Sequence, residues 1–219
     1  MQGDKGSGVD QRTGLEDPRA VDILTTEHWS LISNRTLGYQ EMFGRATIFV
    51  SILSAVVIAL AFLAQATHFG RETLTFAALL IAVALFIGIT TFVRSVAVNF
   101  EDARWVVGMN QLRDAYEQIV PETAPFLAVG RETLYEQHSL GQGSRQQLGN
   151  MGNSLTTTSS VIATLNSVLA GSLAAALVAF FSAGPILAAS IGAVVSIVCG
   201  VLHVRYAARY RQRHVPAAR

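Results

Sequence analysis

The sequence predicts an all-α integral membrane protein with four transmembrane helices in two hairpins and a cytoplasmic helical stalk. Composition is the first reason, because 51% of the residues are apolar and only 14% are charged. The mean hydropathy of +0.39 is higher than the core of a soluble domain requires. The second reason is that charges are missing from blocks of membrane-spanning length, and the third is that arginines gather on one side of those blocks.

Four segments are long enough to span a bilayer. A hydrocarbon layer of roughly 30 Å requires about 20 helical residues, and no Asp, Glu, Lys or Arg interrupts 46–70, 73–93 or 146–204. Within hydrocarbon the backbone must satisfy its own hydrogen bonds, so these segments are expected to be helices. The predicted spans are 46–66, 73–93, 159–182 and 185–204.

The last charge-free block divides at Gly184 and Pro185. A single helix over 159–204 would be roughly 70 Å long, about twice what a bilayer covers. Gly184 suits the left-handed conformation that ends a helix, and Pro185 suits the first position of the next one. We therefore expect a tight turn here, with 46–93 and 159–204 as the two transmembrane hairpins.

The arginines predict the side of the membrane on which each loop lies. The loop after the first span carries only Arg71 and the Gly184-Pro185 turn carries none. By the positive-inside rule, both termini and the central region are cytoplasmic. The excess of Arg over Lys is typical of a GC-rich bacterial genome, so the expected location is the bacterial inner membrane. The arginines that lie nearest the spans or between them on the expected cytoplasmic side are Arg35, Arg45, Arg94, Arg104, Arg113, Arg131, Arg145, Arg205, Arg209, Arg211 and Arg213.

The water-facing parts of the chain form four regions. Residues 1–21 are polar and Gly-rich, as expected of a disordered tail, and 22–45 is predicted as an amphipathic juxtamembrane helix. Residues 94–158 comprise a cytoplasmic helix and a flexible loop, and 205–219 is a basic tail. The arginines of this tail are expected to contact anionic lipid headgroups, and they are Arg205, Arg209, Arg211 and Arg213.

Two helices are predicted outside the membrane. The first, which Thr25 or Thr26 could cap, either lies along the membrane surface or packs against the second. The second extends the 73–93 span and should end before Pro121. Its heptad seam is too short to be stable alone, so it requires the first helix or another copy of the chain as partner. The apolar stripe of the first helix is Trp29, Ile32, Thr36, Tyr39 and Phe43, and the seam of the second is Trp105, Met109, Leu112, Tyr116 and Ile119.

Small residues occupy every fourth position of the last two spans. Lipid gives apolar helices little reason to associate, so close backbone approach through small residues is the main packing device. Three glycines in register favour this interpretation over chance repetition of Ala, although either stripe could instead meet another subunit. The predicted packing residues are Ala163, Ser167, Gly171, Ala175, Ala188, Gly192, Ser196 and Gly200.

The spans offer little chemistry. No ionisable residue lies at mid-membrane, where one would indicate function, and Asn166 is the deepest polar residue. Asn166 could line a pore in an oligomer or hydrogen-bond across helices. The sequence contains no zinc, phosphate-loop or nucleophile motif, so no catalytic residue, metal ligand or cofactor is predicted.

Two functions remain. The first is a non-enzymatic membrane protein that self-associates as a scaffold, sensor or effector, with the cytoplasmic helices also available to a cytoplasmic protein partner. The alternative is an oligomeric pore of weak selectivity. The net charge of +1 makes nucleic acid an unexpected partner.

Overall fold

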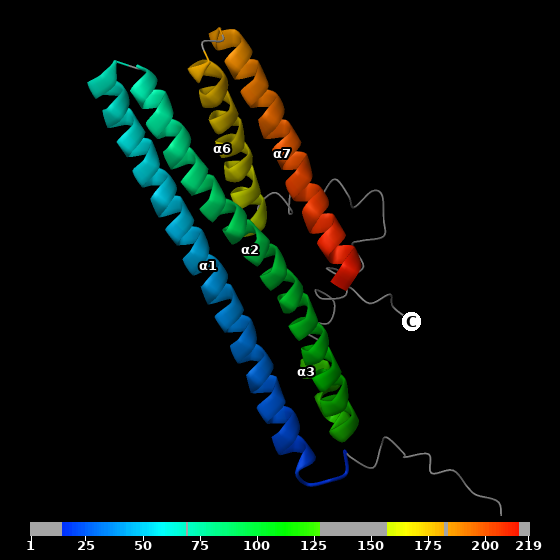
Figure 1. Cartoon of the computed structure of the whole chain (residues 1–219). Helices are drawn as coiled ribbons and strands as arrows, with labels where there is room; N and C mark the ends of the chain where they lie inside the picture. The colour runs from blue at the N-terminus through cyan, green and yellow to red at the C-terminus, as the bar shows by residue number, and fades with distance from the viewer. Residues whose placement is uncertain (1–14, 69, 128–156, 182–183, 215–219) are drawn as a thin grey trace, which may run out of the picture. The chain divides into compact units, whose positions relative to one another are not determined.

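Helices are the only regular elements in the computed structural model, which describes residues 15–68, 70–127, 157–181 and 184–214. This confirms the all-α prediction for the described part of the chain (Figure 1). Four helices are long and apolar enough to cross a membrane, as the sequence predicted. Residues 1–14 of the predicted disordered tail, 128–156 of the predicted loop and 215–219 of the predicted basic tail lie outside the described ranges, whereas 205–214 continue helix α7. The elements are α1 (Ala20–Thr67), α2 (Arg71–Ile119), the short 3-10 helix η1 (Pro121–Thr123), α3 (Ala124–Leu127), α6 (Thr158–Phe180) and α7 (Pro185–His214).

The start of α1 differs from the prediction. The helix begins at Ala20, where the Ala20 amide donates to the Asp17 carbonyl at 2.8 Å and the Asp17 carboxylate accepts from the Arg19 amide at 2.8 Å. Thr26 therefore lies inside the helix, and its hydroxyl donates to the Asp22 carbonyl at 2.8 Å instead of capping. The predicted cap at Thr25 or Thr26 is wrong because Asp17 already begins the turn.

Two of the helix boundaries follow from proline. Helix α2 ends at Ile119, two residues before Pro121, and α7 begins at Pro185. Gly184 does not adopt the left-handed conformation that the sequence suggested. The left-handed residue is His68 (φ 49°), directly after α1. Helix α6 ends at Phe180, four residues before Gly184.

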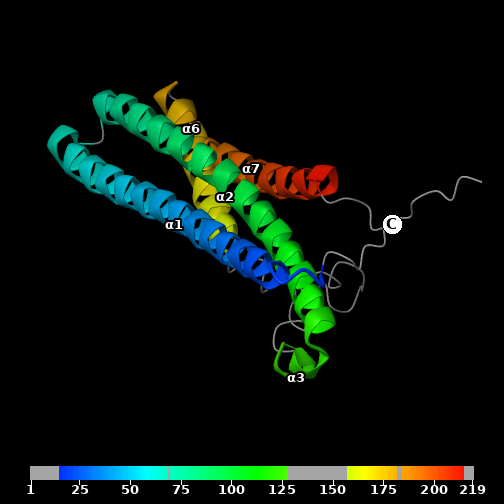
Figure 2. The same ribbon diagram turned by 90° about the horizontal axis from the view of Figure 1, so that it is seen from below.

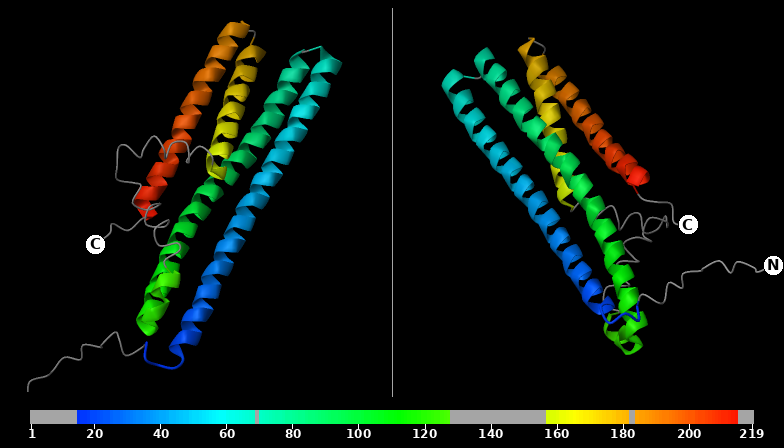
Figure 3. Two further views of the ribbon diagram at one scale, coloured as in Figure 1. Left: turned by 180° about the vertical axis from the view of Figure 1, so that it is seen from behind. Right: turned by 60° about the horizontal axis from the view of Figure 1, so that its bottom comes forward.

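The chain forms two compact units, which we describe separately. One comprises Met1–Leu37 with Asp102–Gly143, and the other comprises Gly38–Glu101 with Ser144–Arg219. The core of the second unit is made by α1, α2 and α6, and its most buried apolar side chains are Phe49, Ala84 and Ile162. Figures 2 and 3 show α6 and α7 side by side in this unit.

Candidate functional site

The contact between α6 and α7 is made by main chain and small side chains. A Cβ added at Gly171 would overlap Ser196 Oγ and the Gly192 carbonyl, and one added at Gly192 would lie 2.8 Å from the Gly171 carbonyl. Each glycine therefore points a Cα hydrogen towards a carbonyl of the other helix, the arrangement of weak Cα–H···O bonds between closely packed helices. A methyl group at either glycine would separate the helices.

Ser167, Ala175 and Gly200, which the sequence also predicted, lie along the same contact. Ser167 Oγ is 3.5 Å from the position of a Cβ on Gly200, and Ala175 Cβ is 3.0 Å from that of a Cβ on Gly192. Ala188 is buried, and Ala163 is half-buried. The structure thus brings Ser167, Gly171 and Ala175 of α6 together with glycines and Ser196 of α7 within one chain.

Asn166 lies on another face of α6, between α1 and α2. Its side chain is 0% exposed, and its Oδ1 occupies the place where a Cβ of Gly88 would project. The same Cβ would be 2.8 Å from Phe49 Cε2, so a side chain of α1 also contacts the space beside Gly88. In the part of the chain that the structure describes, neither Nδ2 nor Oδ1 of Asn166 has a hydrogen-bond partner. Within one chain, Asn166 therefore faces the interior of the second unit.

A second polar contact joins the same two helices. Asn99 of α2 donates from Nδ2 to Ser159 Oγ of α6 at 2.9 Å. Ser95, one turn from Asn99 on α2, is 1% exposed, and its hydroxyl has no partner among the described residues. The α2–α6 contact therefore holds polar groups at several levels, of which the sequence analysis identified only Asn166.

His203 is buried in an aromatic cluster between the middle of α2 and the second half of α7. Its Nδ1 lies 2.8 Å from the Cys199 carbonyl, and its ring meets Phe92 edge-on at 4.5 Å between centroids. Tyr206 lies 6.0 Å from the same phenylalanine. His203 is only 8% exposed, so its side chain faces the protein interior and not the surface.

An ionic cluster ties α1 to α2 in the second unit. Arg94 of α2 donates from Nε and Nη2 to the two oxygens of Glu41 at 3.1 and 2.7 Å, and from Nη1 to Glu101 at 3.1 Å. Arg45 donates to Glu41 from the same helix at 2.9 Å. The hydrogen bond from Arg94 lowers the pKa of Glu41 to about 2, partly opposed by desolvation and assisted by Arg45. This cluster lies just outside the predicted spans, where charges remain accessible to water.

In the first unit, α1 contacts α2 through a face that the sequence did not single out. Arg35 Nε donates to Asp102 Oδ1 at 2.5 Å, and the rings of His28 and Tyr116 are 6.1 Å apart. Leu31 lies against Gly108. These α1 residues share a three- and four-residue spacing one position before the predicted stripe, whose Trp29 is 64% exposed.

The predicted seam of α2 is unevenly buried. Met109 and Leu112 are buried, whereas Trp105, Tyr116 and Ile119 are half-buried. Val106 is more buried than any of them and was not predicted. Val106 precedes Met109 by three residues, so it lies on the same face of α2, and a seam that began at Val106 instead of Trp105 would have included it.

The basic end of α7 is exposed. Arg205, Arg209 and Arg213 are exposed, and the side chain of Arg211 lies outside the described set. Residues four apart on a helix share one face, so the three described arginines project from the same side of α7. This arrangement suits contact with phosphate groups.

No cluster of three or more His, Cys, Asp or Glu side chains in the described ranges could hold a metal ion. Comparisons with protein-family models, with curated proteins and with solved structures find no match.

Proposed function

We propose that the chain is a non-enzymatic multi-pass membrane protein that self-associates and acts as a scaffold, sensor or effector through its cytoplasmic helices. In this proposal α1 with α2, and α6 with α7, form two transmembrane hairpins in the bacterial inner membrane. Both termini are cytoplasmic, and 22–43 with 94–120 form the stalk.

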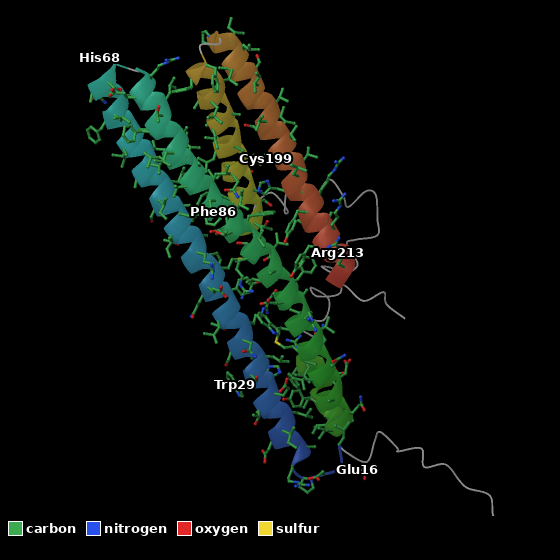
Figure 4. All side chains as sticks on the ribbon, in the orientation of Figure 1. Glu16, Trp29, His68, Phe86, Cys199 and Arg213 are labelled. Atoms are coloured by element: carbon green, nitrogen blue, oxygen red, sulfur yellow. The ribbon has the colours of Figure 1, made fainter. Side chains whose placement is uncertain are left out.

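The observation that carries the proposal is the exposure of Trp29 in the first unit. This side chain is 64% exposed, and Ile23 and Leu37 on the same helix are 66% and 62% exposed. Figure 4 labels Trp29 on α1. Trp is the residue most enriched among residues that dominate binding energy, so an exposed Trp on a helix that the proposal places in water is a candidate contact residue. The expected partner is a second copy or a cytoplasmic protein.

The ionic cluster supports placing the first unit in water. Glu41 and Arg94 are charged and only partly buried, and such groups are costly in hydrocarbon. The membrane boundary is therefore expected beside them, so that the first unit lies beyond it. Exposed Arg205, Arg209 and Arg213 would then meet anionic headgroups on the same side.

The test is the mass of the protein in lipid nanodiscs, measured by mass photometry for the wild type and for Trp29→Ser. We expect the wild type to form oligomers and Trp29→Ser to shift towards monomer. Phe126→Ser is the matched control, because Phe126 of α3 is 82% exposed but lies off the α1 face. A wild type that is strictly monomeric and binds no partner would refute the proposal, and so would an equal loss in both variants.

A weakly selective pore is the second candidate, and the observation that favours it is the polar carboxamide of Asn166, which has no hydrogen-bond partner among the described residues. The sequence analysis left two roles open for Asn166, lining a pore in an oligomer or hydrogen-bonding across helices. Conductance across liposomes that contain the wild type, reduced by Asn166→Leu, is the expected result. Liposomes that show neither conductance nor solute leak would exclude a pore.

A further inference from the structure

Several polar residues and one glycine lie along one line of the contact between α2 and α6. Gly88, Ser95 and Asn99 are seven and four residues apart, so they share a face of α2. Ser159 and Asn166 are seven apart and share a face of α6. At one end of this line Asn99 donates a hydrogen bond to Ser159, and at the other end Asn166 lies against Gly88.

Ser95 lacks the backbone hydrogen bond that many helical hydroxyls of this protein form. Nine Ser and Thr hydroxyls in the described helices, including Thr91 and Ser167, donate to the carbonyl four residues before them. That bond is the usual one for a hydroxyl in an apolar helix. The Ser95 hydroxyl is 1% exposed and does not form it, so its donor remains available on the face that meets α6.

Asn166, at the end of the line farther from Asn99, is also buried without a hydrogen-bond partner among the described residues. Its Oδ1 lies against Gly88, whose Cα–H group is only a weak hydrogen-bond donor. Its Nδ2 carries two strong donors with no acceptor among the described residues. A buried amide in this state is strongly unfavourable unless a partner is bound.

We propose that water enters the contact between α2 and α6 beside Asn99 and Ser159 and hydrogen-bonds Ser95 and Asn166. The ligand must accept hydrogen bonds and be small. An ion is disfavoured because 73–93 and 159–182 contain no charge. A second copy cannot reach a side chain that is 0% exposed. Water is small and accepts hydrogen bonds, and buried waters occupy sites with two to four polar partners.

The hydrated contact ends at Asn166. Beyond it the neighbouring core residues are apolar and buried, with Ala84 at 0% and Leu169 at 7% exposed. Water therefore enters from the Asn99 end only and forms a closed inlet within each chain. This inlet requires no second copy and does not depend on the proposed function.

Silver-ion accessibility tests the inlet, because Ag⁺ reacts with cysteine along narrow water paths. Ser95→Cys and Asn166→Cys are made in the Cys199→Ser background, and Leu169→Cys is the matched buried control on α6. Reconstituted protein is exposed to Ag⁺, unfolded and labelled with a maleimide. We expect Ag⁺ to abolish labelling at 95 and 166 and to leave position 169 fully labelled. Full labelling at 95 and 166, or loss at all three positions, would overturn the proposal.

A second measurement uses the unmodified protein. Water-edited solid-state NMR in bilayers, with asparagine labelled, reports which carboxamides receive magnetisation from water. The Asn166 signal is assigned by its loss in Asn166→Leu. We expect transfer to the Asn166 carboxamide at a rate close to that of Asn99. A rate equal to that of the dry apolar core would refute the inlet even if the cysteine variants misfold.

Discussion

The distance between α2 and α6 is set by one glycine and one asparagine. Gly88 provides no side chain, and Asn166 fills the space with its carboxamide. The sequence analysis identified Asn166 as the deepest polar residue of the spans. Their contact could not be predicted, because two helices far apart in the chain meet there through tertiary packing alone.

Gly88→Ala should destabilise the protein. The new Cβ would overlap Asn166 Oδ1 and lie 2.8 Å from Phe49 Cε2 in a closed space. Overpacking of this kind costs about 1–3 kcal/mol. Thermal unfolding in nanodiscs measures the change in the free energy of unfolding, and Asn166→Ala in the same chain should recover part of it.

Gly44→Ala is the control for this prediction. No atom lies within 4 Å of a Cβ added at Gly44, so the substitution should stabilise α1 by about 0.5–1 kcal/mol through helix propensity. If both substitutions stabilise, the close contact at Gly88 does not exist.

At the scale of elements, prolines and charge-free blocks predicted most helix limits, but not which face of α1 contacts α2. Two heptad stripes lie side by side on this helix, one through Trp29 and the other through His28, Leu31 and Arg35. Hydrophobicity favours the first. The structure uses the second, because the ion pair of Arg35 with Asp102 and the fit of Leu31 against Gly108 depend on the partner helix.

The link between α1 and α2 at Glu41 should weaken in acid. The pKa of Glu41 is about 2 in the folded protein, below its ordinary value of 4.5, because Arg94 hydrogen-bonds the carboxylate. A lowered folded-state pKa gives stability that is complete above about pH 4.5 and is lost as the pH falls towards 2. Unfolding midpoints between pH 6 and 3 should fall more steeply for the wild type than for Glu41→Gln.

Glu122→Gln serves as the control for the acid experiment, because Glu122 is an exposed residue of η1. This variant should retain the steep fall of the wild type. Identical pH profiles for the wild type and Glu41→Gln would show that the ion pair does not contribute to stability.

For the whole molecule, hydropathy was sufficient to predict four helices able to cross a membrane. The positions at which the two compact units divide were not predictable. The division falls between Leu37 and Gly38 inside α1 and between Glu101 and Asp102 inside α2, and both helices continue through it without a break. Helix propensity is a local property, whereas a unit is defined by contacts between distant segments.

The proposed orientation predicts which residues can be labelled from outside the cell. In a Cys199→Ser background, Glu72→Cys should react with a membrane-impermeant maleimide in intact spheroplasts. Glu122→Cys should react only after the membrane is permeabilised. Labelling of Glu122→Cys in intact spheroplasts would reverse the orientation or remove the first hairpin from the membrane.

The glycine contact between α6 and α7 also bears on the order of assembly. It joins residues close in sequence, such as Gly171 and Gly192, so it closes a short loop at little entropic cost. The contact of Gly88 with Asn166 closes a much longer one. During synthesis α6 and α7 should therefore associate before α6 packs against α2. Disulfide trapping of Ser167→Cys with Gly200→Cys, compared with Gly88→Cys and Asn166→Cys at successive times, would reveal which contact forms first.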